Sequence, residues 1–512
     1  MLDTLFITPN NATRIYQSLS NKYSAIETPT WSLLLAEACR VKSFKVDILD
    51  CLAENLNLER SFERILKLNP RLIVFVVYGQ NVNAGTTNMS GAIMLSEYLK
   101  EKKIKIPIAF IGSHVQAVPI ETIKKEESID FVFTNEGVYS LLNILKLKDI
   151  NFENLKKIKG VAFKFKSKVY FNDVEKVVPQ DRMDIDLPGY AWDLLPFKDK
   201  PLDLYRSPMW HAEYDENKRS PYAAIQTSLG CQFKCSFCMI NIINRNDKSE
   251  LGIAGHYSGM RFWSTNFIIK EFDKLIKLGV ETIRIVDEMF LLNPKYYVPL
   301  CKELAQRNKK DNLRMWAYSR IDTVKNPEIL ELVRSAGIKW LCLGIESGDK
   351  KVRLEVAKGK FEEVDVRNVV KQIHKSDIEI MANYIFGLPG DTNETIAKTF
   401  ALSKELCTSG WNTYAAMALP GSQLYREAVE KNIKLPDNYE GYSFHSYNTQ
   451  NLPTEKLKAS SILKLRDECF YEYHNYKPFL KRISEKFGAK AAENIKQMSK
   501  IKLKRKIIEQ NI

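Results

Sequence analysis

The sequence predicts an α/β protein in which two parallel-sheet units follow each other and a helical region ends the chain. In the first part, apolar, β-rich runs alternate with helix-patterned stretches; the runs are residues 5–8, 44–49, 72–78, 106–111 and 131–134. Six further strand–helix units follow, with strands predicted at residues 223–229, 282–287, 315–319, 341–345, 380–386 and 414–419. Repeated βα units favour parallel sheets. We therefore expect a doubly wound, flavodoxin- or Rossmann-like domain, a TIM-like partial (β/α)6 barrel and a helical C-terminal region.

The hydrophobic periodicity and the positions of glycine and proline suggest where these parts begin and end. Between the two βα series the pattern weakens into a small predicted hairpin and a linker containing proline and glycine. Three predicted barrel helices stop at Gly279, Gly337 and Gly410, as helices with a left-handed glycine after the last turn do. The expected segments are a doubly wound domain at 1–148, a connector at 149–220, the partial barrel at 221–426 and the helical region at 427–512.

Composition narrows the function classes. The 512 residues are 45% hydrophobic and 27% charged, as in an ordinary soluble protein, and no apolar run approaches the roughly 20 residues of a membrane span. No secretory signal follows Met1, and six of the nine cysteines are scattered, so we expect a reduced, cytoplasmic protein. The formal charge of +14 is concentrated in part at residues 500–506, where we expect a solvated terminal helix. Contact of this tail with an anionic membrane or substrate is the alternative; a nucleic-acid substrate is disfavoured.

Three cysteines form the most informative motif. Cys231, Cys235 and Cys238 are spaced as CxxxCxxC on one short predicted loop after the first barrel strand. Three thiolates so arranged can bind three irons of a cubane cluster and leave the fourth iron open to a small molecule. Structural zinc sites usually close with four protein ligands, whereas this loop has three and no histidine. Spacing alone leaves a zinc loop or chance open.

The cysteine spacing resembles that of the radical S-adenosylmethionine (SAM) superfamily, whose motif also carries an aromatic residue at the position of Phe237. The strings at 344–348 (Gly-Ile-Glu-Ser-Gly) and 387–390 (Gly-Leu-Pro-Gly) strengthen the resemblance. It implies a [4Fe–4S] cluster and SAM, with carboxylates at the ribose and amino groups, Arg320 at the SAM carboxylate and glycines beside the adenine. The SAM-binding residues so expected are Phe237, Asp287, Glu288, Ser319, Arg320, Glu346 and Gly387.

The predicted N-terminal doubly wound domain resembles a cobalamin-binding domain found in front of many radical SAM enzymes. The GxGxxG fingerprint of dinucleotide-binding domains is absent, whereas residues 112–119 and 130–137 match two strand-end motifs of the cobalamin family in part, with Ser113 and Asn135 in place of glycines. No DxHxxG loop is present, so the resemblance implies base-off cobalamin, with His114 lining the pocket and not binding cobalt. The cobalamin-binding residues so expected are Asn81, Gly112, Ser113, His114, Glu136 and Gly137.

The two resemblances together imply an enzyme. A flavodoxin- or ferredoxin-type donor would reduce the cluster, SAM would be cleaved to a 5′-deoxyadenosyl radical, and methylcobalamin would methylate an unactivated carbon of a small molecule or lipid. The alternatives are a non-methylating cyclase or rearrangement enzyme, a tRNA methylthiotransferase and a non-catalytic cobalamin or iron–sulfur sensor. The methylthiotransferase class carries three further N-terminal cysteines, where this chain has only Cys39 and Cys51. No residue is assigned as a general acid or base.

Overall fold

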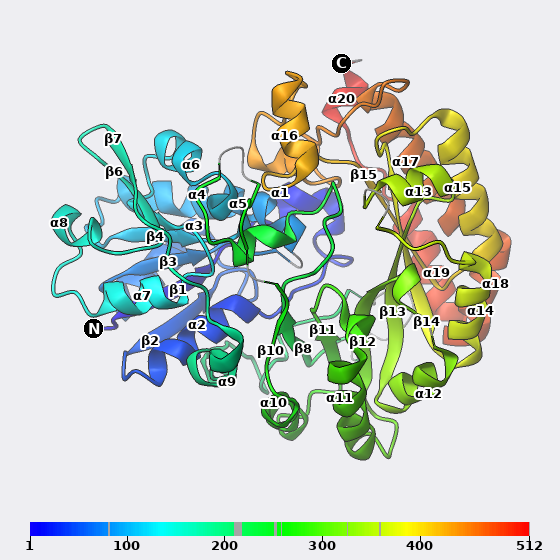
Figure 1. Cartoon of the computed structure of the whole chain (residues 1–512), viewed down its shortest axis with the longest axis horizontal. Helices are drawn as coiled ribbons and strands as arrows, with labels where there is room; N and C mark the ends of the chain where they lie inside the picture. Colours follow the sequence, from blue (N-terminus) through cyan, green and yellow to red (C-terminus); the bar gives the residue numbers. More distant parts are fainter. Residues whose placement is uncertain are drawn as a thin grey trace.

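The computed structural model describes residues 1–79, 82–208, 218–249, 253–257, 259–324, 326–357 and 360–510. Two sheets organise the molecule, one of seven strands and one of six. Figure 1 shows the first sheet, in blue and cyan, beside the second, in green and yellow, with the C-terminal helices packed on the outer side of the second sheet.

The first sheet has the strand order β2-β1-β3-β4-β5-β6-β7, and its first five strands are parallel. Successive residues of β1 face opposite cores: Phe6 packs on one face of the sheet, Leu5 and Ile7 on the other. Order 2-1-3-4-5 is the flavodoxin-like doubly wound order, as predicted. The parallel strands are β1 Thr4–Thr8, β2 Val46–Asp50, β3 Ile73–Val76, β4 Ile108–Ile111 and β5 Phe131–Phe133, and the larger covering helices are α2 Thr30–Arg40, α3 Leu58–Leu68, α4 Gly85–Glu101 and α7 Val138–Leu145.

The hairpin that the sequence analysis placed in the connector extends this first sheet. Strands β6 (Val161–Phe165) and β7 (Lys168–Phe171) are antiparallel, and β6 pairs with β5 through Phe131 and Phe163. Local alternation predicts such a hairpin. The pairing of this hairpin with β5 is a long-range contact that local sequence does not predict. It is favoured because β5 would otherwise be an unpaired edge of the sheet.

The second sheet is an open barrel of six parallel strands in the order β15-β14-β13-β12-β11-β8. The predicted first strand is divided: β8 enters the barrel, and the short β9 turns away to pair with β10. The strands are β8 Tyr222–Ile225, β9 Ser228–Leu229, β10 Arg261–Phe262, β11 Thr282–Ile285, β12 Arg314–Arg320, β13 Ile338–Glu346, β14 Glu379–Phe386 and β15 Gly410–Ala415, and the main intervening helices are α10 Thr265–Lys277, α11 Pro294–Arg307, α12 Pro327–Ser335, α14 Val366–Lys375 and α15 Asn393–Leu406.

The last barrel strand begins four residues earlier than predicted. Gly279 and Gly337 follow their helices with φ of +81° and +98°, as expected. Gly410, in contrast, is the first residue of β15, and Cys407 takes the left-handed position after α15 with φ of +43°. The buried apolar stretch 416–418, which suggested a strand, continues beyond the ladder as loop.

Both edges of the open barrel are covered by segments distant in sequence. At the β8 edge, Thr28 Oγ1 accepts a hydrogen bond from Ala224 N (2.9 Å) and donates one to Ala224 O (3.2 Å). At the β15 edge, helix α17 (Ala459–His474) donates from Arg466 Nε to Thr413 O (2.8 Å). These contacts satisfy backbone groups that an open edge leaves unpaired. The N-terminal and C-terminal parts of the chain thus close the barrel seam.

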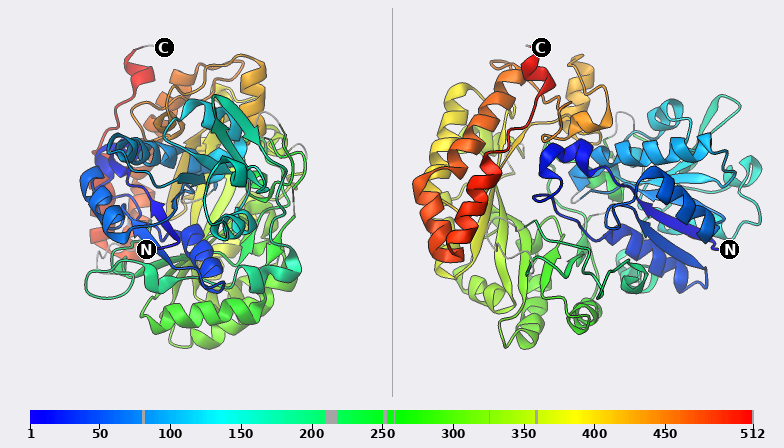
Figure 2. Two further views of the ribbon diagram at one scale, coloured as in Figure 1. Left: turned by 90° about the vertical axis from the view of Figure 1, so that its left-hand side faces the viewer. Right: turned by 180° about the vertical axis from the view of Figure 1, so that it is seen from behind.

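The C-terminal region is largely helical, as predicted. Figure 2 shows its helices along the outer side of the barrel. Residues 501–505, where a solvated helix was predicted, instead form no regular secondary structure, and Arg505 is buried against α17. No helix among the described residues has the length and apolar character needed to cross a membrane. The helices after α17 are α18 Lys477–Phe487, α19 Ala489–Ser499 and α20 Lys506–Glu509.

Candidate functional site

A cavity of about 460 Å³ lies where the carboxyl ends of the barrel strands face the first sheet unit. All three motif cysteines line it, and so do Asn83 from the N-terminal unit and Arg466 from the C-terminal region. In barrels of this kind the carboxyl ends of the strands carry the chemistry. The cavity therefore joins all three parts of the chain at one site.

The cysteine loop holds its sulfur atoms by hydrogen bonds from three different places. Phe233 N donates to Cys231 Sγ (3.4 Å), inside the loop. Arg320 Nη1, at the end of β12, donates to Cys235 Sγ (3.7 Å), and Asn83 Nδ2 of the N-terminal unit donates to Cys238 Sγ (3.8 Å). Each sulfur thus has one N–H donor.

The electrostatics of the loop suit an iron–sulfur cluster. Burial raises the pKa of Cys231 to about 12 and that of Cys235 to about 11, and it raises the pKa of Cys238 well above its usual value. Thiols with raised pKa values are converted to stable thiolates when they ligate metal cations. Within the described part of the chain, no three His, Cys, Asp or Glu side chains are grouped so as to hold one metal ion. The loop offers three thiols and no histidine, which matches the three protein ligands of an open cubane cluster and lacks the fourth ligand of a structural zinc site.

Five of the predicted SAM-binding residues line the cavity: Phe237, Glu288, Ser319, Arg320 and Glu346. Burial raises the pKa of Glu288 and of Glu346 to about 7 each. Glu346 also has a φ of +64°, which a residue with a side chain rarely adopts. Two strained or desolvated carboxyls beside the cysteine loop are typical of a binding site and not of a solvated surface.

Arg320 is held more tightly than the sequence suggested. Its Nε donates to Asp322 Oδ1 (2.6 Å) and its Nη2 to Asp322 Oδ2 (2.5 Å). The guanidinium also lies between the rings of Phe233 (3.6 Å) and Phe361 (4.3 Å). Its carboxylate partner in this structure is therefore Asp322, and its remaining edge is directed to Cys235.

Asp287 and Gly387, which were also expected at SAM, do not line the cavity. Asp287 accepts hydrogen bonds from Thr227 N, Thr227 Oγ1 and Ser228 Oγ, each at 2.6 Å. Gly387 has a φ of +81°, and its N–H donates to Asp391 Oδ2 (2.9 Å). The polar groups of both residues are hydrogen-bonded within the fold, and these bonds stabilise the loops after β8 and β14.

Of the cobalamin-binding residues expected after β3 and β4, Gly112 and Ser113 do not line the cavity. Asn81 is outside the described residues. At Gly112 an added Cβ would come within 2.4 Å of Val77 O, so the glycine permits close backbone approach. Ser113 Oγ donates to Val82 O (2.9 Å), which anchors the segment before α4.

His114 is buried and does not line the cavity. Its Nδ1 is 3.3 Å from Thr86 Oγ1, and its ring packs edge-on against Tyr439. Burial lowers the pKa of His114 to about 3, so the imidazole is neutral. The structure gives it a packing position between α4 and the C-terminal region.

Glu136 and Gly137 also lie away from the cavity. Glu136 pairs with Arg261 of β10 (2.7 Å), both side chains being buried. Gly137 has a φ of +76° and starts helix α7. Glu136 therefore connects the first sheet unit to the barrel.

Sequence reasoning did not single out the polar residues that the C-terminal region contributes to the cavity wall. His445, Arg466 and His474 line the cavity together with aromatic rings. No local motif surrounds these residues. Only the packing of α17 on β15 brings them to a site built more than 200 residues earlier in the chain.

Comparisons with known proteins agree with this geometry. The model of the radical SAM superfamily matches residues 225–402. An uncharacterised methyltransferase of Pyrococcus horikoshii is 26% identical over 86% of this chain and 87% of its own length. The anaerobic magnesium-protoporphyrin IX monomethyl ester cyclase of Cereibacter sphaeroides is 22% identical over 92% of this chain and 70% of its own length.

Solved structures share the fold. The radical SAM methyltransferase TsrM from Kitasatospora setae, with cobalamin and a [4Fe–4S] cluster bound, has a TM-score of 0.63 at 14% identity, covering 85% of this chain and 76% of its own. The cobalamin-dependent SAM radical enzyme OxsB, with aqua-cobalamin and SAM bound, has a TM-score of 0.66 at 14% identity. The match covers 98% of this chain and 71% of the OxsB chain. Together with the cysteine loop at the mouth of a six-stranded partial barrel, the family match shows that residues 225–402 form a radical SAM domain.

Proposed function

We propose that this protein is a cobalamin-dependent radical SAM enzyme that methylates an unactivated carbon of a small molecule or lipid. One observation carries the proposal: the sulfurs of three neighbouring cysteines, each with an N–H donor, lie at a cavity that the first sheet unit also lines. When bound, a [4Fe–4S] cluster and SAM supply a 5′-deoxyadenosyl radical, and cobalamin supplies the methyl group.

The residues of the cavity have distinct proposed tasks. Cys231, Cys235 and Cys238 hold the cluster, and their N–H donors stabilise negative charge on the sulfurs. Glu288 and Glu346 accept hydrogen bonds from the hydroxyl and amino groups of SAM. Arg320, fixed by its carboxylate partner and two rings, keeps a positive charge beside the cluster. The enclosing walls exclude water from the reacting carbon.

The doubly wound unit is the proposed cobalamin domain. Ligands of such sheets bind beyond the carboxyl ends of the strands, and Asn83, Ala84 and Thr87 bring that edge to the cavity. Gly112, Ser113 and His114 do not line the cavity, and we propose that they position the residues of this edge through contacts with Val77, Val82 and Thr86. We assign no cobalt ligand to this chain, which agrees with base-off binding.

Relatives favour methyl transfer and leave one second candidate. A hopanoid C-2 methylase and a tryptophan 2-C-methyltransferase are 29% and 25% identical, each over 38% of this chain. Non-methylating cyclisation is the second candidate, because the magnesium-protoporphyrin cyclase aligns over 92% of the chain. A flavodoxin- or ferredoxin-type donor is proposed for either reaction. All nine cysteines are free, which favours the reducing cytoplasm.

The test uses protein purified without oxygen and reconstituted with iron, sulfide and hydroxocobalamin. Bound iron and cobalamin are measured first, then 5′-deoxyadenosine and S-adenosylhomocysteine after addition of SAM and a reductant. The proposal requires 5′-deoxyadenosine, and S-adenosylhomocysteine distinguishes methyl transfer from cyclisation. Cys235→Ala is expected to lose the cluster, whereas Cys301→Ala, the same change at a buried cysteine outside the cavity, is expected to keep it. Iron binding without cobalamin would refute the role of the first sheet unit.

A further inference from the structure

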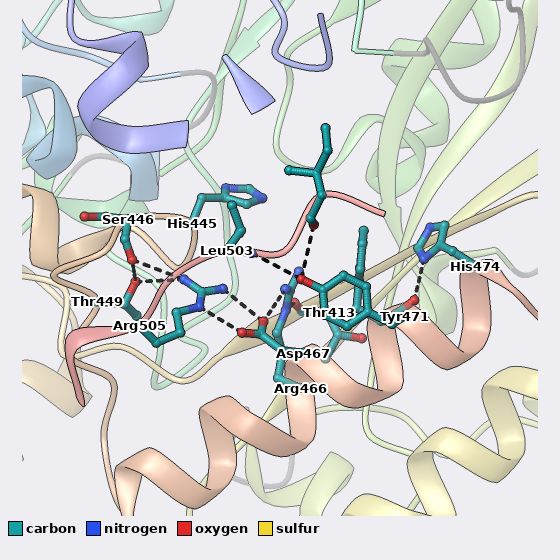
Figure 3. A network of polar contacts seen from close by, with 12 residues as sticks. Thr413, His445, Ser446, Thr449, Arg466, Asp467, Tyr471, His474, Leu503 and Arg505 are labelled. Carbon is teal, nitrogen blue, oxygen red and sulfur yellow. Dashed lines mark hydrogen bonds and ion pairs between the residues drawn. The ribbon is translucent and has the colours of Figure 1, made fainter. Parts of the chain in front are cut away.

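A buried arginine faces the cavity with an unused donor. Only 3% of the surface of Arg466 is exposed. Its Nε donates to Thr413 O (2.8 Å) and its Nη1 to Asp467 Oδ1 (2.8 Å). No described residue accepts a hydrogen bond from its Nη2, although Arg466 lines the cavity. Figure 3 shows the arginine within this network.

The network carries one positive charge more than it neutralises. Asp467 is shared with a second buried arginine, Arg505, whose Nε and Nη2 donate to its two carboxylate oxygens at 2.8 and 2.9 Å. Arg505 is further fixed by Ser446 O and Thr449 Oγ1, both at 3.2 Å. Two guanidinium groups therefore meet one carboxylate. An arginine stays protonated even when buried, so a cation without a full counter-charge lies against the cavity.

The two cavity histidines do not add to this charge. Burial lowers the pKa of His474 to about 4 and that of His445 well below its usual value, so both imidazoles are neutral. His474 Nδ1 donates to Phe470 O (2.8 Å), which leaves Nε2 as an acceptor. The rings of Phe470 and Phe444 flank the Arg466 guanidinium at 4.9 and 5.2 Å and limit its rotation.

The lining of the cavity that Arg466 faces is mostly apolar. It includes Met381, Ile385, Tyr414, Met417 and Met498. A hydrophobic body would remove this surface from water, whereas Arg466 requires an anionic partner, because an uncompensated buried charge costs several kcal/mol.

We propose that Arg466 binds an oxyanion of the substrate, a carboxylate or a phosphate, that is attached to a hydrophobic body. The inference rests on the proposed function, in which this cavity is the substrate site. The carboxylate of SAM is not the proposed partner, because it is expected at Arg320, which hydrogen-bonds Cys235 of the cysteine loop. Arg466 contacts Thr413 in β15, and β15 and β8 are the two opposite edges of the barrel sheet.

The test measures binding without radical chemistry. The full chain, kept free of oxygen, SAM and reductant, is titrated calorimetrically with 3-phenylpropionate, 3-phenylpropyl phosphate and the neutral 3-phenylpropanol. At least one anion is expected to bind about tenfold or more tightly than the alcohol, as a charge-assisted hydrogen bond provides. The tighter of the two anions identifies carboxylate or phosphate as the recognised group. Equal affinity for all three probes, or no binding of either anion, would overturn the proposal.

Variants then assign the preference to the arginine. Arg466→Gln is expected to abolish it, and Arg466→Lys to keep part of it. Lys464→Gln removes a cation from the exposed face of the same helix and is expected to change nothing. A preference that survives in folded Arg466→Gln would also overturn the proposal. If that variant does not fold, the wild-type affinities and Arg466→Lys decide. Loss of methyl transfer with an intact anion preference would refute the proposed function and leave this subsite standing.

Discussion

The buried ion pair between Glu136 and Arg261 should hold the first sheet unit on the barrel. Arg261 Nη2 donates to Glu136 Oε2 (2.7 Å) and to Asn244 Oδ1 (2.6 Å), while its Nη1 donates to Val178 O (2.6 Å). Glu136 Oε1 accepts from Val178 N. Only 4% and 2% of the two side chains are exposed, so water cannot replace either partner.

Glu136→Gln preserves the shape of the side chain but leaves the Arg261 charge without its carboxylate. Removing one partner of a buried pair costs about 3–5 kcal/mol. For a cooperative unit of 150–250 residues, this corresponds to a decrease in Tm of about 10 °C. The double variant Glu136→Gln/Arg261→Met buries no charge and should recover more than half of the loss.

Scanning calorimetry of the four proteins of this cycle, at one scan rate and without oxygen, measures the coupling. Glu303→Gln is the control, because Glu303 pairs with Arg307 on the surface, with 51% of its side chain exposed, and such pairs contribute under about 1 kcal/mol. If the losses of the two single variants simply add in the double variant, the pair does not hold the units together and the reasoning is wrong.

Three further changes test other contacts. Glu346→Gln should weaken SAM binding and leave the absorbance of the cluster unchanged; because burial raises the pKa of Glu346 to about 7 from 4.5, wild-type stability should fall as the pH rises through about 7, and the variant should lack this loss. Gly230→Ala, at a φ of +89° directly before the cysteine loop, should destabilise the loop by about 1–2 kcal/mol and lower iron content after reconstitution; unchanged iron would contradict it. Thr28→Val should leave the backbone N–H and C=O of Ala224 unpaired at a cost of about 1–3 kcal/mol, and hydrogen exchange at Ala224 should become faster.

The barrel could be predicted well because its signals are local. Apolar β-rich runs located five of its six strands, and the left-handed glycines after α10 and α12 were predicted from sequence alone. The last strand was misplaced because hydrophobicity does not distinguish a buried strand from a buried loop. At 416–418 the apolar residues continue past the end of the ladder.

In the candidate site, too, local features could be predicted from sequence and long-range contacts could not. The cysteine motif lies within one short loop, so the sequence alone revealed it. That the carboxyl ends of the other barrel strands lie near this loop follows from the parallel barrel. The hydrogen-bond partners of Asp287, by contrast, are not local: Thr227 and Ser228 donate to its carboxylate from the segment after β8. The ion-pair partner of Glu136 could not be predicted for the same reason, since Arg261 is 125 residues away.

The order of strands and helices, the flavodoxin-like and barrel classes and the cysteine loop could be predicted from sequence, because each depends on periodicity or spacing within a few tens of residues. Which segments cover the barrel edges and which side chains complete the cavity depends on long-range packing. Thr28 and Arg466 reach their edge strands across 196 and 53 residues respectively. Their positions are set by unpaired backbone groups and buried charge that exist only once the barrel has formed.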